Sequence, residues 1–243
     1  MTDRIAFVGP TLDRTARDRF VNSPNASRIK LAPPARFGDI ARAVQDGVAV
    51  IVLIDGMFGE AAPPRHKEIL YALSQGVVVI GAASLGALRA CECAAFGMVG
   101  IGRIFEAYRD GVLSADDAVA VLHGPPELGH CALTDPLVTI EANMRMLKVR
   151  SLISDPEFEI VMAFARDAHF SQRHAARMLR DCISGDKVRA ERLTLELKAH
   201  WRDPKADDAL EALNYAAELP AVRAKNERSW VLADTQYALA SIS

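Results

Sequence analysis

The chain has 243 residues, half of them apolar and a quarter charged, so it is long enough to bury a core without disulfides or metals. Its formal net charge is −2, which gives no global attraction to nucleic acid or to an anionic membrane. No apolar run approaches the ~18 residues of a membrane span. We therefore expect neither nucleic acid nor membrane as a partner.

The first residues do not resemble an export signal. An acid stands near the front and the first apolar run ends at a Gly-Pro pair, whereas a secretion signal needs a basic front and a longer apolar stretch. We expect a cytoplasmic protein whose four cysteines are reduced. Their spacing matches no zinc pattern, so we expect no metal and no cofactor.

Short apolar runs alternate with helical patterns through the first half. The runs are residues 5–8, 29–32, 48–54, 77–80 and 119–122, and helical patterns occupy 36–45, 65–74 and 85–96. Near-continuous apolar strands joined by helices are typical of a parallel sheet covered on both faces. The sequence therefore predicts an α/β, Rossmann-like fold. The fifth run also suits a helix, because Ala118 and Ala120 flank Val119.

After about residue 133 the strand pattern stops. Helical patterns occupy residues 136–153, 156–169, 172–183, 187–201 and 206–219. We therefore expect two domains, an α/β core over residues 1–135 that holds the active site and a helical subdomain over residues 136–243. The helical part carries no glycine-rich or catalytic-looking cluster. We interpret it as a docking surface that exposes Arg173, Arg177 and Arg180.

Glycines and polar side chains gather at the predicted carboxyl ends of the strands. Ligands of open parallel sheets bind outside these ends, and small residues let backbone and ligand approach closely. We expect one cleft there, lined by side chains from several strand ends, with glycines contacting the substrate. The cleft residues are Thr11, Asp55, His66, Ser84 and His123, and the glycines are Gly9 and Gly56.

Ser84 stands where the fourth strand turns into a helix. The string GAASLG over residues 81–86 resembles a nucleophile elbow, although the first glycine of the strict motif is Ala82 here. At such a turn the hydroxyl is exposed and the Leu85 amide points at a developing oxyanion. Serine is also a preferred helix cap, so the residue type leaves both roles open.

Three further residues are candidates for the chemistry. His66 lies on the sheet-facing stripe of its helix, from which a general base can reach over the strand ends; the alternative is a histidine bonded to a loop. Lys67 is a cation at a helix amino end, where cations are disfavoured. Either Glu68 offsets its charge, or Lys67 binds an anionic ligand. Asp55 either orients the base, as in a catalytic triad, or forms a turn with Gly56.

Charged residues on the later helices are candidates for substrate contact. They are Arg89, Arg103 and Glu106. Together with Glu92 they also fit ordinary surface salt bridges, each worth little. Residues 100–103 read Gly-Ile-Gly-Arg, which suggests a tight loop able to close over the site.

Several strings along the first half resemble one known family. They are VGPTL (8–12), IDGMFG (54–59), HKEIL (66–70), GAASLGALRA (81–90), FGMVG (96–100), GRIFEAY (102–108) and HGP (123–125). They are similar to the TfuA-like family from about residue 5 to residue 133. The resemblance is specific there, and the helical half is compatible with it.

This resemblance implies a function. TfuA proteins work beside YcaO enzymes in making peptide thioamides, in ribosomally made natural products and in some modified enzymes. The family is thought to hydrolyse a C-terminal thiocarboxylate on a ThiS-like sulfur carrier protein. The sulfide released is used by YcaO on an ATP-activated backbone amide. Such hydrolysis is acyl transfer to water, which suits Ser84, a base and backbone oxyanion donors. Ser84 could attack directly, or His66 could activate a water.

Three other functions fit parts of the sequence. A non-catalytic adaptor would bring carrier or substrate peptide to YcaO and would need neither Ser84 nor His66. A nucleotide binder would use glycine-rich strand ends, yet neither Gly-x-Gly-x-x-Gly nor a phosphate loop is present. A persulfide sulfurtransferase would use Cys91 or Cys93, which lie within a predicted helix rather than at its exposed start.

Overall fold

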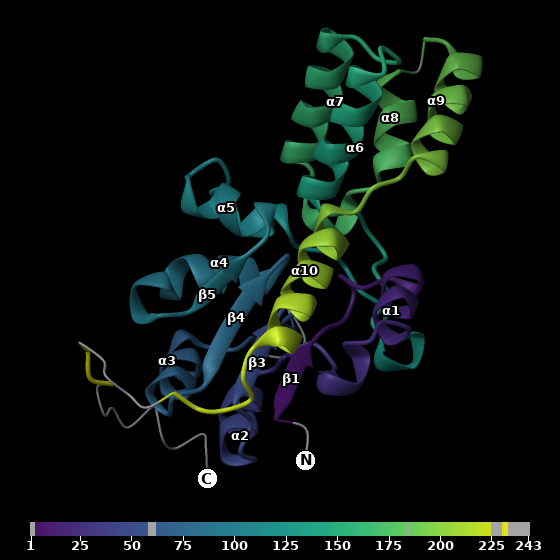
Figure 1. Ribbon diagram of the computed structural model, residues 1–243. Coiled ribbons are helices and arrows are strands. Elements are labelled where there is room, and N and C mark those ends of the chain that lie inside the picture. Colours follow the sequence, from purple (N-terminus) through teal and green to yellow (C-terminus); the bar gives the residue numbers. More distant parts are fainter. Residues whose placement is uncertain (1–2, 58–61, 184, 225–229, 233–243) are drawn as a thin grey trace. The chain divides into compact units, whose positions relative to one another are not determined.

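The computed structural model describes residues 3–57, 62–183, 185–224 and 230–232 (Figure 1). Phe58 and Gly59, which belong to one of the strings quoted for the family resemblance, lie outside the described residues. The chain divides into two compact units. Unit one contains residues 1–114 and 205–243, and unit two contains residues 115–204.

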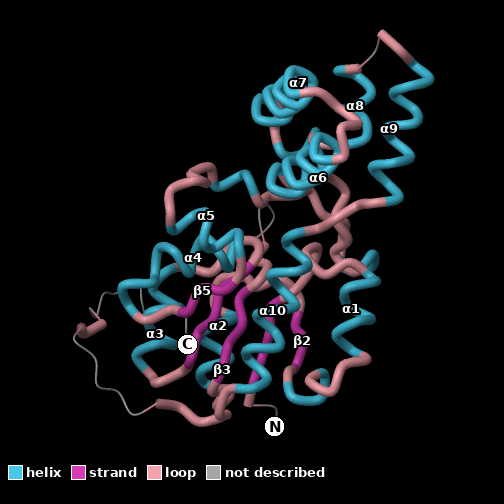
Figure 2. Tube along the Cα trace, turned by 45° about the horizontal axis from the view of Figure 1, so that its top comes forward, coloured by secondary structure: helices cyan, strands magenta, loops and turns pink. Residues whose placement is uncertain are grey.

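Unit one is built on a five-stranded parallel sheet, whose strands lie side by side in Figure 2. The predicted α/β fold with a parallel sheet is therefore confirmed. The order is β2-β1-β3-β4-β5, so the direction of winding changes between β1 and β3. Open sheets of this order bind ligands at the carboxyl ends beside that change. The strands are β1 (Arg4–Phe7), β2 (Lys30–Ala32), β3 (Val50–Leu53), β4 (Val78–Ala82) and β5 (Val99–Ile101).

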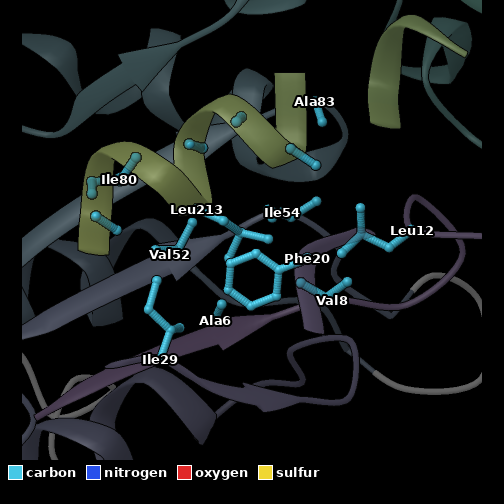
Figure 3. Packing of buried hydrophobic residues seen from close by; sticks show 14 of the residues in the cluster. Ala6, Val8, Leu12, Phe20, Ile29, Val52, Ile54, Ile80, Ala83 and Leu213 are labelled. Atoms are coloured by element: carbon cyan, nitrogen blue, oxygen red, sulfur yellow. The ribbon is translucent and has the colours of Figure 1, made fainter. Parts of the chain in front are cut away.

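Helices cover both faces of this sheet, because alternate residues of each strand point to opposite sides. On one face, Val52 and Ile54 pack with Phe20 and Leu213 (Figure 3). On the other, Ile51 packs in a second cluster with residues of α2, α3 and α4. The helices of unit one are α1 (Arg14–Val21), α2 (Asp39–Gln45), α3 (His66–Ser74), α4 (Leu85–Cys93), α5 (Arg103–Arg109) and α10 (Pro204–Glu218).

The helix α10 completes the sheet's core from near the end of the chain. Its buried face is mostly alanine, with Leu213 fully buried against the sheet. The expected division at residue 135 groups this helix with the other C-terminal helices. Apolar spacing in residues 206–219 reveals that one face is buried, but it does not reveal which element covers that face.

Unit two is helical, with its own core. Met144, Leu147, Met162 and Leu193 are fully buried in it. Residues from four helices build this core, so each helix buries one apolar stripe against its neighbours. These helices are α6 (Leu137–Val149), α7 (Asp155–Asp167), α8 (Ala175–Cys182) and α9 (Lys187–Ala199).

The predicted strand over residues 119–122 is wrong. A 3-10 helix ends at Ala118, and the residues after it form no strand. Alanine has low strand propensity, so the two alanines that flank Val119 disfavour a strand even though the run is apolar. The fifth strand is instead β5, paired with β4 through Val99 and Ile80. Gly100 in β5 lies against the ring of Phe105, where any side chain would overlap that ring.

The expectation that Arg173 is exposed is also wrong, since only 1% of it is accessible. Its guanidinium donates to the carbonyl oxygens of Ala165 and Asp117, and to the Asp117 carboxylate at 2.8 Å. A run of arginines on a helical pattern does not reveal which one turns inward. Arg177, by contrast, has 71% of its side chain exposed.

Candidate functional site

The carboxyl ends of β1 and β3 are joined by Asp55, which directly follows Ile54 and is 1% exposed. Its Oδ2 accepts hydrogen bonds from the amides of Gly9, at 2.8 Å, and Thr11, at 3.1 Å. Its Oδ1 accepts one from the Thr11 hydroxyl at 2.6 Å. This carboxylate therefore holds the loop after β1 at the place where the winding of the sheet changes.

Beside this loop, the chain makes a strained turn between β4 and α4. Ala83 has a φ of 65° and is fully buried. The amide of Ser84 donates to the carbonyl oxygen of Ala82 at 2.7 Å. An i to i+2 hydrogen bond around a residue with positive φ is the mark of a γ-turn of the rare, strained kind. Such backbone costs about 1–3 kcal/mol and clusters at functional sites.

Glycines let the first turn of α4 lie directly against the sheet. A Cβ on Gly86 would overlap the carbonyl oxygen of Leu53, and the Gly86 amide donates to Ile54 O at 3.0 Å. A Cβ on Gly56 would overlap the Leu85 side chain. The helix start, the end of β3 and the loop after it are therefore in contact.

The hydroxyl of Ser84 is not used as a helix cap. Ser84 occupies the N-cap position of α4, yet its side chain accepts no capping hydrogen bond. Of the next three amides, that of Gly86 donates to Ile54 and that of Ala87 to the Ser84 carbonyl oxygen. Among the described residues, the Leu85 amide has no acceptor, as the first amides of a helix generally lack one within it. The turn thus presents a hydroxyl and a donor next to each other.

His66, the first residue of α3, is paired with an acid on α4. Its Nε2 lies 2.7 Å from Oε2 of Glu92, and the same oxygen lies 2.6 Å from Arg89 Nη1. Half of the imidazole surface is exposed, whereas Arg89 is 14% exposed. Asp55 does not orient His66, because its carboxylate oxygens accept hydrogen bonds from Gly9 and Thr11 in the loop after β1.

Arg103 begins α5, and Glu106 lies on its first turn; both are exposed. The helix start is held by Asp208 of α10, which accepts from the amides of Arg103 at 3.1 Å and Ile104 at 2.8 Å. Burial raises the pKa of Asp208 to about 6, although these two amide bonds act in the opposite direction. The predicted tight loop before Arg103 is β5 followed by Gly102 at a φ of 93°.

His123 lies in unit two, in a small loop closed by an antiparallel bridge to Ala132. Its Nδ1 lies 3.0 Å from the carbonyl oxygen of Gly124, and its ring meets that of His130 edge-on, with centroids 5.6 Å apart. Because no strand precedes it, the sheet-edge argument for His123 does not hold.

The structure thus groups the candidate residues into separate contacts rather than one hydrogen-bonded chain. The groups are Asp55 with Gly9 and Thr11, Gly56 with Leu85, and His66 with Glu92 and Arg89. Among the described residues, Ser84 and His66 are not hydrogen-bonded to each other, and Lys67 is an exposed neighbour of His66.

From the sequence alone, we expect Glu92 only in a surface ion pair. The spacing of Arg89 and Glu92, three residues apart on one helix, is the available sign of their pairing. That His66 joins them depends on how α3 and α4 pack, which local spacing does not reveal.

The described part of the chain lacks both a metal-binding cluster and a membrane-spanning helix. No three His, Cys, Asp or Glu side chains there are arranged to hold a metal ion. No helix there is both long and apolar enough to cross a membrane.

A known protein family matches the middle of the chain. The model of a family described as TfuA-like protein matches residues 55–174. The matched segment includes Asp55, His66, Ser84 and Glu92, whereas Gly9 and Thr11 precede it. No curated protein matches the sequence significantly.

Proposed function

Because the chain belongs to the TfuA-like family through residues 55–174, we propose that it hydrolyses the C-terminal thiocarboxylate of a ThiS-like sulfur carrier protein. The sulfide goes to a YcaO enzyme, which uses it to form thioamides in a peptide backbone. The observation that carries this proposal is the strained turn at Ala83, which presents the uncapped hydroxyl of Ser84 beside the Leu85 amide. Strain of this kind is retained where a side chain must be held for chemistry.

The reaction divides into two acyl transfers. Ser84 Oγ attacks the thiocarboxylate carbon and gives its proton to a base, and the C–S bond then breaks to release sulfide. Water attacks the resulting ester and restores the hydroxyl. The sum consumes one water and yields the carrier carboxylate and hydrogen sulfide. The Leu85 amide is suited to stabilise the oxyanion of each tetrahedral intermediate.

His66 supplies the base in this scheme. If its Nε2–H donates to Glu92, the tautomer leaves the Nδ1 lone pair to take a proton, since a neutral imidazole has one donor and one acceptor. Arg89 holds the same Glu92 oxygen and so limits its movement. The scheme requires the half-exposed imidazole to turn toward Ser84 when the carrier tail arrives. Asp55 serves as a scaffold for the loop after β1.

The test is sulfide release from purified thiocarboxylated carrier, with carrier mass followed in parallel. Ser84→Ala and His66→Ala should each lower the rate by roughly 10²–10⁴-fold, the usual worth of a positioned base or nucleophile. The double variant should lose little more, because residues acting as one unit are non-additive. A mass increase on Ser84 after rapid quenching distinguishes covalent attack from activation of water.

Matched variants control for unrelated effects. His200→Ala removes another half-exposed histidine that pairs with a glutamate, Glu196. Ser114→Ala removes an exposed hydroxyl elsewhere in unit one. Both should retain the wild-type rate. If folded Ser84→Ala and His66→Ala variants release sulfide as fast as the wild type, the catalytic assignment fails. If the wild type releases none yet accelerates the YcaO reaction, the protein is an adaptor.

A further inference from the structure

We propose that Arg36 and Arg65 form a binding site for an acidic segment on the surface of the protein substrate. This inference rests on the proposed function in one respect, namely that the substrate is itself a protein whose surface meets the region around Ser84. The two arginines come from different elements, the loop between β2 and α2 and the residue before α3. We call them the arginine pair.

Local packing holds the arginine pair in place. The guanidinium carbon of Arg65 lies 4.6 Å from the centre of the Phe37 ring, and Phe37 directly follows Arg36. The Phe37 amide donates to Ala62 O at 2.8 Å, which fastens the two segments together. A guanidinium stacked on an aromatic ring keeps its charge and its donors available at its edge.

The acids next to the arginine pair are directed at backbone amides. Glu68 is 5% exposed, and its two oxygens accept from the amides of Arg65, at 3.1 Å, and Gly38, at 2.7 Å. Burial raises the pKa of Glu68, although these amides act in the opposite direction. Asp39 accepts from the Arg36 amide at 2.8 Å and also contacts Arg42 at 3.3 Å.

Within the described residues, the two guanidinium groups therefore have no neutralising carboxylate. Arg36 and Arg65 are both exposed, and neither forms an ion pair with any residue that the structure describes. The chain as a whole has a formal net charge of −2. A local excess of positive charge on a slightly acidic protein attracts an anionic partner to that place and not to the whole surface.

This surface is continuous with the candidate site. Ala35, which precedes Arg36, pairs with Gly56 in a parallel bridge, and the position of a Gly56 Cβ falls on the Leu85 side chain. Leu85 follows Ser84. An extended tail with its terminal thiocarboxylate at Ser84 would thus leave the body of its own protein near the arginine pair.

An acidic protein segment fits these groups better than a small anion. Exposed guanidiniums gain little from one isolated charge, because water and salt screen each such pair. Several carboxylates on one surface engage both arginines together, and the attraction also speeds and orients the encounter. The two groups thus act as a recognition site and not as part of the chemistry.

The probe is a fluorescein-labelled peptide of six glutamates, compared with the same peptide made of glutamines. Anisotropy is measured with the full chain at low and at physiological salt. The wild type should bind the glutamate peptide more tightly, and more so at low salt. Arg36→Glu with Arg65→Glu should weaken this binding by at least ~10-fold, through lost attraction and added repulsion. Arg65→Lys with native Arg36 should retain most of it.

Arg166→Glu is the matched control, because it reverses one exposed charge in unit two. It should bind as the wild type does. Equal binding by the folded double variant, or an equal loss in Arg166→Glu, would overturn the proposal. The proposal would also be overturned if a single-stranded oligonucleotide of equal charge bound more tightly than the glutamate peptide. These measurements need no turnover, so they test the role of the arginine pair independently of the hydrolysis by Ser84.

Discussion

Thr11 donates its hydroxyl hydrogen to Asp55 over 2.6 Å, and this bond spans the gap between the ends of β1 and β3. The buried carboxylate also accepts hydrogen bonds from the amides of Gly9 and Thr11. One side chain at the end of β3 therefore holds three donors of the loop after β1.

Replacing Asp55 by Asn should destabilise the protein by about 2–3 kcal/mol, because the new amide group puts a donor where an acceptor is required. Urea unfolding followed by circular dichroism measures this loss. Asp110→Asn is the control, since the exposed carboxylate of Asp110 accepts hydrogen bonds from the exposed Arg109. Equal stability of both variants would show that the Asp55 bonds add nothing.

Replacing Gly86 by Ala should be strongly destabilising, by about 2 kcal/mol or more, because the added methyl overlaps Leu53 O and α4 must move off the sheet. The same unfolding experiment applies. Gly185→Ala should change little, since nothing lies within 4 Å of a Cβ there. A wild-type urea unfolding midpoint for Gly86→Ala would show that the start of α4 can shift at little cost to make room for the methyl group.

Replacing Glu92 by Gln should lower sulfide release by roughly 10–100-fold if His66 is the base. The glutamine amide can donate to Nε2, which would place the imidazole proton on Nδ1, where the base must be free. Glu196→Gln, beside His200, should retain the wild-type rate. An unchanged rate in folded Glu92→Gln would remove Glu92 from the mechanism.

Truncating Arg173 to Ala should cost unit two about 1–3 kcal/mol, since the carbonyl oxygen of Ala165 loses its buried donor, whereas Asp117, with 43% of its side chain exposed, is hydrated by water. Hydrogen exchange of α7 and α8 amides, read by mass spectrometry, locates the loss. Arg177→Ala, which removes an exposed side chain paired with Asp181, should be nearly neutral. Similar exchange in the two variants would contradict the buried role.

Stability should fall as the pH rises from about 4 to about 6, through Asp208. The native pKa of about 6 lies above the usual 3.8, so the folded state binds the proton more tightly and loses this advantage as the carboxyl ionises. Wild type and Asp208→Asn, compared by denaturant titration at several pH values, should diverge by on the order of 2 kcal/mol over this window. A constant difference between them would refute the shift.

The strands of the sheet were predictable where apolar runs are long. Four of the five strands fall within or beside the predicted runs, because a strand buried on both faces needs such a run. The exception, β5, is three residues long and contains Gly100. Its place in the sheet comes from pairing with β4, a contact between segments that local propensity does not encode.

The candidate site was predictable in part. Ser84 at a strand-to-helix turn follows from small residues on both sides, and the structure adds the positive φ of Ala83 that no residue type announces. The partner of Asp55 is Thr11 and that of His66 is Glu92. Both pairings join residues far apart in the chain, so they depend on how strands and helices pack.

The position of α10 has a consequence for how the molecule is made. The ribosome delivers the strands first, yet the helix that shields one sheet face emerges only after residues 115–204. Until then, Val52 and Ile54 lack the cover that Leu213 provides. Incompletely folded chains of this length are prone to aggregate through exposed apolar surface. Premature release before α10 should therefore yield aggregates rather than a shorter folded protein.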